Sequence, residues 1–315
     1  MKVVVTGGAG FIGANLCRRL VDDPRIDEVV AVDDLSSGST GNLDGLKVRL
    51  LQGSVLDREL LDDACAGANS IVHLAAIPGV PPSLADPLRS HLVNATGTLE
   101  VLDAARRAGD AHVIVASSAA VYGATDVVPT HEQLPVAPLS PYGASKVATE
   151  NYALCYQRSF GLPALAFRFF NIYGPLQTVS HGYAAVVPAF VEAALTGRPI
   201  PLDGDGLQTR DLVFIGDVVS VLVDAVARRV THDAPVNLAV GTRTNLLTLI
   251  DTLSQIVGID LPIEHRPVRP GDIRDSQANT ETLQKLFPGL TATDLATGLG
   301  QTVDWYRTVV DAHNH

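Results

Sequence analysis

The feature that most limits how this chain can fold is a glycine-rich turn near its start. The turn Gly7-Gly8-Ala9-Gly10-Phe11-Ile12-Gly13 directly follows the apolar run Val3–Thr6. Glycines at 7, 10 and 13 allow a tight turn, the close approach of a pyrophosphate, and close packing of a following helix on the strand. The first N–H groups of that helix would favour an anion. The motif therefore predicts a strand–turn–helix unit that binds a dinucleotide.

Short β-rich runs then alternate with helical patterns up to about residue 170. The helical stretches include Asn15–Val21 and Gly97–Ala108. The runs are apolar without alternation, which is typical of strands covered on both faces. This order predicts an α/β fold, a doubly wound parallel sheet with right-handed crossovers. The predicted strands are Val3–Thr6, Val29–Asp33, Lys47–Leu51, Ser70–His73, His112–Ala116 and Ala164–Phe167.

The texture of the sequence changes after Gly174-Pro175, where proline and glycine become frequent. Helical patterns at Ala184–Leu195, Asp217–Ala227 and Leu246–Val257 are separated by short loops. We therefore expect two domains, a dinucleotide-binding domain over residues 1–173 and a smaller substrate-binding domain over residues 174–315. The second domain is expected to return a strand or two to the first.

Composition narrows the class of function. Hydrophobic residues make up 46% of the chain and charged residues 18%, which is enough apolar material for a buried core. The net charge of −11 is poorly matched to a phosphate backbone, so we expect no nucleic-acid partner. The three cysteines are odd in number and far apart, so we expect no disulfide framework, no metal site and a reducing cytoplasmic location. No apolar run reaches the roughly 18 residues of a membrane span, so no membrane partner is expected.

Asp33 ends the second predicted strand, 20 residues after Gly13. A carboxylate at this place accepts hydrogen bonds from a ribose 2′-hydroxyl and repels a 2′-phosphate. The predicted cofactor is therefore NAD rather than NADP.

A second motif, Tyr142-Gly-Ala-Ser-Lys146, places a phenol and an ammonium one helical turn apart on the same face. A phenol ordinarily ionises near pH 10. A neighbouring ammonium and a positively charged nicotinamide ring would stabilise the phenolate and let it act as a base. The pair follows the strand that ends in Ser117-Ser118, where a hydroxyl would face the ligand crevice of a parallel sheet. Ser118, Tyr142 and Lys146 are therefore the predicted catalytic residues.

Taken together, these motifs resemble the extended short-chain dehydrogenases/reductases, specifically their NAD-dependent sugar-nucleotide epimerase/dehydratase group. The resemblance spans essentially the whole chain and is nearest to UDP-glucose/UDP-N-acetylglucosamine 4-epimerases. Besides the two motifs above, it is carried by His73–Ala76, Asn94–Thr98, Ser117–Gly123, Arg168–Pro175, Arg210-Asp211 and Arg269–Asp272. It implies a Rossmann-type sheet, an isomerase that oxidises carbon 4 transiently with tightly bound NAD, and a homodimer joined through helices flanking Gly97–Ala108 and Tyr142–Ser159.

The resemblance also implies roles for individual residues. Ser118 and Tyr142 would contact the reacting hydroxyl, and Lys146 would hold the nicotinamide ribose. The implied cofactor contacts are Gly7, Gly10, Phe11, Ile12, Gly13, Asp33, Leu74, Ala75, Ala76, Asn94, Tyr142, Lys146 and Phe170. The implied contacts to a UDP-sugar are Ser118, Asn171, Arg210, Arg269, Asp272 and Ser276. Guanidinium groups suit diphosphate oxygens well, although a single arginine is more often a solvated surface charge.

Departures from the family pattern narrow the reaction. Sugar-nucleotide 4,6-dehydratases have an Asp-Glu pair where this chain has Ala119-Ala120, and UDP-glucuronate decarboxylases keep a glutamate at the second of these positions. Without those acids, both activities are disfavoured. Ser54-Val55 replaces an aspartate that contacts adenine in many relatives, so the sequence does not predict that adenine contact.

Several alternatives stay open. They are a UDP-glucuronate 4-epimerase, an epimerase or 4-ketoreductase for a TDP- or CDP-sugar, a net oxidoreductase, and a non-catalytic NAD-sensing protein. Ser276 lies four positions after Asp272, where a tyrosine restricts UDP-galactose 4-epimerases to plain hexoses. Serine would leave room for an acetamido group, unless it merely faces solvent.

Overall fold

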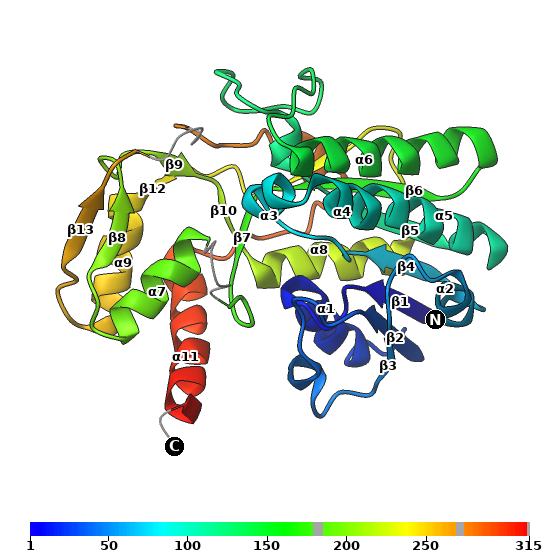
Figure 1. The fold of residues 1–315 in the computed structure, drawn as a ribbon, viewed down its shortest axis with the longest axis horizontal. Coiled ribbons are helices and arrows are strands. Elements are labelled where there is room, and N and C mark those ends of the chain that lie inside the picture. Colours follow the sequence, from blue (N-terminus) through cyan, green and yellow to red (C-terminus); the bar gives the residue numbers. More distant parts are fainter. Residues whose placement is uncertain (179–184, 269–273, 314–315) are drawn as a thin grey trace.

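The computed structural model describes residues 1–178, 185–268 and 274–313, and its centre is a seven-stranded sheet (Figure 1). The strand order is β11-β6-β5-β4-β1-β2-β3, and every neighbouring pair is parallel. The bounds are β1 (Lys2–Thr6), β2 (Glu28–Asp33), β3 (Val48–Gln52), β4 (Ser70–His73), β5 (His112–Ser118), β6 (Ala164–Phe169) and β11 (Val236–Leu238). Strand order reverses between β1 and β4, and parallel sheets bind ligands at the carboxyl ends of the strands beside such a reversal.

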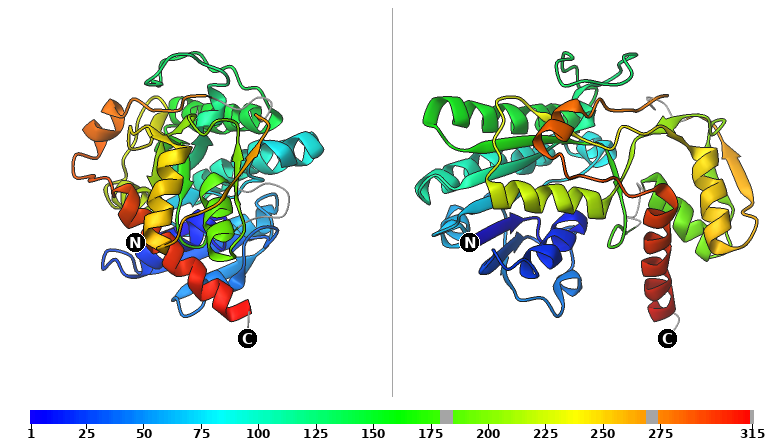
Figure 2. Two further views of the ribbon diagram at one scale, coloured as in Figure 1. Left: turned by 90° about the vertical axis from the view of Figure 1, so that its left-hand side faces the viewer. Right: turned by 180° about the vertical axis from the view of Figure 1, so that it is seen from behind.

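Helices cover both faces of this sheet, which explains why its strands are apolar without alternation (Figures 1 and 2). Val3 and Val5 of β1 belong to one buried cluster and Val4 to the other, and β2, β5 and β6 divide in the same way. The first cluster includes residues of α1 (Phe11–Val21) and α8 (Ile215–Arg228). The second includes residues of α2 (Arg58–Cys65), α5 (Gly97–Arg107) and α6 (Pro141–Phe160).

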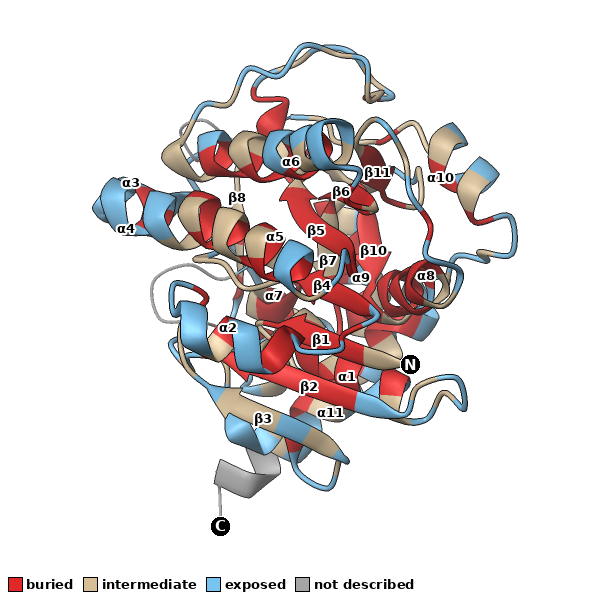
Figure 3. Ribbon diagram, turned by 90° about the vertical axis from the view of Figure 1, so that its right-hand side faces the viewer, coloured by how far each residue is buried: buried red, intermediate tan, exposed pale blue. Residues whose placement is uncertain are grey.

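β3 departs from the expectation that all of these strands are covered on both faces. It lies at the edge of the sheet, and its five residues are only half-buried or exposed (Figure 3). An edge strand has one neighbour and less helical cover, so Arg49 and Gln52 remain exposed there.

The second half of the chain adds three small sheets beside the first. They pair β7 (Asn171–Tyr173) with β10 (Leu212–Phe214), β8 (Ile200–Asp203) with β13 (Ile263–Arg266), and β9 (Thr209–Arg210) with β12 (Thr244–Asn245). Around them pack α7 (Val186–Leu195), α9 (Leu246–Val257) and α11 (Leu295–His313) (Figure 2). The shorter helical elements are η1 (Thr40–Leu43), α3 (Val80–Ala85), α4 (Pro87–His91), η2 (Leu92–Thr96), η3 (Ala119–Val121) and α10 (Glu281–Leu286).

α8 and β11 follow residue 173 in sequence but belong to the layers of the first sheet, where α8 packs beside α1 and β11 pairs with β6. The chain therefore crosses between its two parts more than once, and the division at residue 173 stays a prediction. No helix in the described part of the chain is both long and apolar enough to cross a lipid bilayer.

Candidate active site

The glycine-rich turn has the geometry of a pyrophosphate cradle. Gly7 has a φ of +69°, and a Cβ on Gly13 would lie 2.0 Å from the Gly7 carbonyl oxygen. Gly10 is the N-cap of α1, and no side chain among the described residues caps this helix. The first N–H groups of α1 are therefore left for a ligand anion, and the absence of side chains lets that anion approach the backbone.

Asp33 is held in place by this same turn. Its Oδ2 accepts a hydrogen bond from the Ala9 N–H at 2.9 Å, and its Oδ1 accepts one from the Leu35 N–H at 2.8 Å. A carboxylate oxygen has room for two hydrogen bonds, so each oxygen can still accept one from a ribose hydroxyl. The side chain is only 7% exposed and lines the cavity beside the turn.

A cavity of about 590 Å³ runs from the glycine turn along the carboxyl ends of β1, β4 and β5. It is lined by every cofactor residue expected from the sequence except Asn94, namely Gly7, Gly10, Phe11, Ile12, Gly13, Asp33, Leu74, Ala75, Ala76, Tyr142, Lys146 and Phe170. Ser54 and Val55, which replace the adenine-contacting aspartate of many relatives, line it as well. Its lining residues, which include the glycine cradle and the Asp33 carboxylate, fit an extended dinucleotide.

Asn94 lies behind the wall of this cavity. It is 1% exposed, and its amide exchanges two hydrogen bonds with the backbone of Ile77, at 2.8 and 3.1 Å. Its Nδ2 also donates to Ser145 Oγ at 3.0 Å. The amide thus fixes the loop after β4, whose residue Ile77 lines the cavity, and the predicted direct contact between Asn94 and the cofactor stays a prediction.

His73 belongs to a buried chain of hydrogen bonds beneath the same loop. Its Nδ1 lies 2.7 Å from Thr6 Oγ1, and its Nε2 lies 3.1 Å from Thr98 Oγ1. Thr98 Oγ1 donates its own proton to the Asn94 carbonyl, so it must accept from His73, which places the proton on Nε2. Burial, followed by the nearby positive charge of Lys146, lowers the pKa of His73 to about 3, so the ring is neutral.

The local sequence places Tyr142 in the first turn of α6. Ser140 Oγ accepts a hydrogen bond from the Gly143 N–H at 3.1 Å, and Pro141 occupies the first helical position. A helix N-terminus carries a partial positive charge, which favours an anion such as phenolate in that turn. The predicted helix carrying Tyr142 and Lys146 is confirmed, and the structure shows that it begins at Pro141.

Lys146 stands one turn further along α6, beside the same ring. Its Nζ lies 5.8 Å from the centroid of the Tyr142 ring and donates to the Ala116 carbonyl at 2.8 Å. Burial lowers the pKa of Lys146 from 10.5 to about 8. The ammonium is therefore still the main form at neutral pH, and it is anchored to the end of β5.

Ser118 is the last residue of β5 and faces the same cavity as Tyr142 and Lys146. Its Oγ accepts a hydrogen bond from the Ala120 N–H at 3.1 Å, which leaves the hydroxyl proton available for a substrate oxygen. Ala119 and Ala120 begin the short helix η3 that follows, so methyl groups stand where an acid pair would be needed for water elimination.

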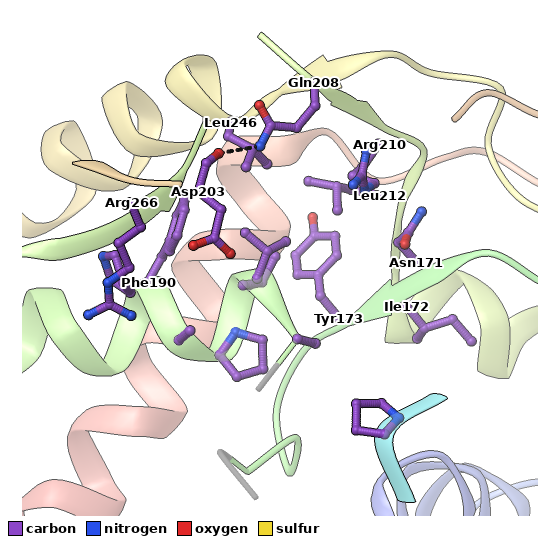
Figure 4. Close-up of a pocket in the computed structure, with 17 residues that line it drawn as sticks. Asn171, Ile172, Tyr173, Phe190, Asp203, Gln208, Arg210, Leu212, Leu246 and Arg266 are labelled. Carbon is purple, nitrogen blue, oxygen red and sulfur yellow. Dashed lines mark hydrogen bonds between the residues drawn. The ribbon is translucent and has the colours of Figure 1, made fainter. Parts of the chain in front are cut away.

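A second cavity, of about 630 Å³, adjoins the first (Figure 4). Ile172 and Ala185 line both cavities. Of the predicted substrate residues, Asn171 and Arg210 line the second cavity, and the guanidinium of Arg210 donates to the Thr209 carbonyl at 2.8 Å.

The other predicted substrate residues are not brought together there. Arg269 and Asp272 lie outside the described residues. Ser276 is half-buried, and its N–H donates to the Thr209 carbonyl at 3.2 Å. Within the described part of the chain, Ser276 is not among the residues that line either cavity.

Sequence reasoning missed several residues of the second cavity. Phe190, Asp203, Gln208 and Arg266 line it from α7, β8, the β8–β9 connection and β13 (Figure 4). Gln208 is 6% exposed, and its Nε2 donates to the Asp203 carbonyl at 2.7 Å. The glycine-containing turn Gly204-Asp205-Gly206 was a local signal for a loop here, but only the pairing of β8 with β13 places Arg266 beside Asp203.

The arrangement combines a dinucleotide cradle, a phenol with a neighbouring ammonium, and an adjoining cavity that contains a guanidinium. Such a site can hold a diphosphate ligand with one hydroxyl near Tyr142 and Ser118, and can exchange a proton with it while the dinucleotide exchanges a hydride.

Comparison with known proteins agrees with this geometry. Residues 3–241 match the NAD dependent epimerase/dehydratase family. The chain is 36% identical over 313 residues to the UDP-glucose 4-epimerase of Mycolicibacterium smegmatis, which covers 98% of this chain and 99% of that protein.

Two solved structures have the same fold over nearly their whole length. A UDP-N-acetylglucosamine 4-epimerase from Methanobrevibacter ruminantium M1, in complex with UDP-N-acetylmuramic acid, has a TM-score of 0.92 at 32% identity, covering 98% of each chain. A UDP-glucose 4-epimerase from Thermotoga maritima, with UDP-glucose, has a TM-score of 0.91 at 32% identity, covering 98% of this chain and 100% of that one.

Proposed function

This chain belongs to the NAD-dependent epimerase/dehydratase family, and from that membership we propose that it interconverts UDP-glucose and UDP-galactose by inverting carbon 4. The enzyme is an NAD-dependent sugar-nucleotide epimerase. The observation that carries the choice of reaction is the composition of the β5 end, where Ser118 faces the cavity of Tyr142 and Lys146 while Ala119 and Ala120 supply no acid.

Bound NAD supplies the hydride acceptor and donor at carbon 4. Tyr142 takes the proton of the 4-hydroxyl and later returns it, while Ser118 donates a hydrogen bond to the same oxygen. Lys146 stabilises the phenolate by its charge, together with the N-terminus of α6. Rotation of the keto sugar about its diphosphate link would present its other face, to which the hydride would return. Oxidation and reduction of carbon 4 then cancel, so there is no net oxidation and NAD stays bound.

A 4,6-dehydratase would need a proton donor and acceptor beside the reacting carbons, and hydrocarbon side chains at 119 and 120 cannot supply them. The remaining candidates share the residues described above. They differ in the sugar or the base, as in a UDP-glucuronate 4-epimerase or an enzyme of TDP- or CDP-sugars, or in net redox change, as in a 4-ketoreductase.

We assign the diphosphate to the second cavity, with Arg210 and Asn171 as its ligands there and with Arg269 as an expected further partner. Asp272 is an expected contact to the UDP-sugar and, as a carboxylate, would accept hydrogen bonds from its hydroxyl or N–H groups. Ser276 is proposed to leave space for an N-acetyl group on carbon 2. Ser276 is hydrogen-bonded to the backbone of Thr209, and Thr209 directly precedes Arg210. This contact supports the proposal that Ser276 lies at the edge of the substrate site.

We also propose that the enzyme is a homodimer. α3, α4, η2 and α6 pack beside one another, and exposed positions of α3, α4 and α6 can be followed in Figure 3. Large apolar side chains stand at some of the exposed positions. They are Leu84, Leu88, Leu92, Tyr152 and Phe160, which are 39–78% exposed. Large exposed apolar surfaces mark interfaces, so we propose that these side chains face a second copy of the chain. In sedimentation velocity experiments we expect wild type to be a dimer and Leu88→Glu to be shifted toward monomer, because the variant places a charge in the proposed interface. A monomeric wild type would refute the proposal.

The function is tested by incubating the purified enzyme with a panel of UDP-hexoses and resolving the products by NMR. We expect UDP-glucose and UDP-galactose to equilibrate without added NAD and without a stoichiometric change in absorbance at 340 nm. Stoichiometric NADH formation would indicate a net oxidoreductase, and turnover of UDP-glucuronate alone would replace the proposed substrate.

A further inference from the structure

A carboxylate is buried between α6 and the sheet, directly beneath the catalytic residues. Glu150 is 2% exposed and accepts three hydrogen bonds. Ser117 Oγ donates one at 2.7 Å, and Arg168 donates two, from Nε at 3.0 Å and from Nη2 at 2.6 Å. No role in the reaction proposed above involves these three side chains.

Their places in the fold connect the elements that carry the catalytic groups. Ser117 directly precedes Ser118 on β5. Arg168 is the residue of β6 that pairs with Ser117, so the side chains of Ser117 and Arg168 project from the same face of the sheet. Glu150 lies on α6 one turn after Lys146 and two turns after Tyr142. The carboxylate therefore joins the helix of Tyr142 to the strand of Ser118.

The arginine that holds this carboxylate is itself fixed. Arg168 Nη1 donates to the Glu132 carbonyl at 3.2 Å, and its guanidinium lies 4.7 Å from the centroid of the Tyr122 ring. Tyr122 in turn donates to Asn237 Oδ1 at 2.6 Å. The ion pair thus connects α6 to the fixed Arg168 of β6, and the hydrogen bond between Ser117 and Glu150 adds a direct connection from β5 to α6.

Stability alone does not explain a buried ion pair at this position. Desolvation of two charges usually cancels their attraction, and an apolar replacement of similar volume is often as stable or more so. Apolar contacts fill other parts of the same interface, for example Val113 and Val115 of β5 and Ala153 of α6. What hydrogen bonds add, and apolar contacts do not, is direction and a fixed distance.

We infer that Glu150 and Ser117 are positioning residues, whose hydrogen bond sets the distance between Ser118 on β5 and Tyr142 on α6. This inference rests on the proposed function for its kinetic test, because Ser118 and Tyr142 must share one substrate oxygen. A small displacement of one of two such groups from the reacting atom can lower turnover by one to two orders of magnitude.

Ser117→Ala is the informative variant, because it removes the hydroxyl but leaves the Glu150–Arg168 pair intact. Glu150→Gln would leave Arg168 buried without its partner charge and could unfold the chain. Ser70→Ala is the matched control, because Ser70 is also a buried serine of the sheet and is hydrogen-bonded to His112 Nδ1 at 3.4 Å. Ser70 is the first residue of β4, at the end of that strand that lies away from the catalytic residues. Ser117→Thr restores a hydroxyl.

We expect Ser117→Ala to lower kcat on the order of 10-fold with KM within about twofold of wild type and with NAD retained. Ser117→Thr should recover most of kcat, and Ser70→Ala should keep it. If Ser117→Ala and Ser70→Ala have the same kcat, or if Thr fails to rescue an intact, NAD-loaded protein, the inference is wrong.

A second measurement does not depend on activity. The phenol of Tyr142 can be titrated by ultraviolet difference spectra against Tyr142→Phe in the holoenzyme. Ser117→Ala should move that titration upward, because Lys146 and Ser118 are held less closely to the ring, whereas Ser70→Ala should leave it in place. An inactive wild type would refute the proposed substrate, and the titration would still decide the inference: an unmoved midpoint refutes it.

Discussion

Two buried histidines should make this enzyme lose stability in mild acid. Burial lowers the pKa of His73 to about 3 and that of His112 to about 4, against an ordinary value of 6.5. The Nε2 of His112 lies 2.8 Å from the Val230 carbonyl, which can only accept, so the neutral ring carries its proton on Nε2. Because the folded pKa values lie below the unfolded ones, the unfolded chain binds more protons as the pH falls, and stability falls with it.

The size of the effect follows from these values. Between pH 7 and pH 5.5, each histidine should lower the free energy of unfolding by about 1.2 kcal/mol, so the pair should lower it by about 2.5 kcal/mol. The window lies above the usual range of carboxyl pKa values, so acidic residues contribute little to it.

The measurement is urea denaturation followed by circular dichroism at both pH values, on wild type and His112→Gln. The glutamine amide can still donate to the Val230 carbonyl but cannot bind a proton, so the variant should lose only about 1.2 kcal/mol. His91→Gln, at an exposed position, should keep the full loss of wild type. A His112→Gln protein whose loss equals that of wild type would refute the reasoning.

Four further predictions concern the site. Wild type should bind NAD at least about tenfold more tightly than NADP, and Asp33→Ala should narrow that ratio in calorimetric titrations; equal affinities in wild type would remove the role of Asp33. Tyr142→Phe should lower kcat by on the order of 10²–10⁴ with little change in the melting temperature, and a near-normal rate would mean that the proton goes elsewhere. The pKa of Lys146, about 8, predicts that NAD binding to the apoprotein weakens as the pH rises through 8 and the ammonium is lost, whereas Lys146→Met should bind weakly at every pH. Ser276→Tyr should abolish turnover of UDP-N-acetylhexosamines and spare that of plain UDP-hexoses in product assays, and equal loss of both would refute the proposal that Ser276 leaves space for the N-acetyl group.

The sequence by itself determined the parts of this enzyme that depend on local spacing. A strand, a glycine turn and a helix follow one another within residues 2–21, so their covalent order fixes where a pyrophosphate can approach. Tyr142 and Lys146 share a helix face because four residues make about one turn, and Ser140 and Pro141 mark where that helix begins. The strand positions in the first half could also be predicted from local sequence, because strands that are covered on both faces are apolar throughout.

The tertiary structure alone decided which distant residues meet. Arg266 reaches the second cavity because β13 pairs with β8, and β3 is half-exposed because it lies at the sheet edge. Asn94 turned out to bind the backbone of Ile77, and Glu150 to bind Ser117 and Arg168, across separations of 17 to 33 residues. A polar side chain that becomes buried on folding needs a hydrogen-bond partner. Which residue becomes that partner depends on how the helix packs on the sheet, and no local sequence pattern encodes that packing.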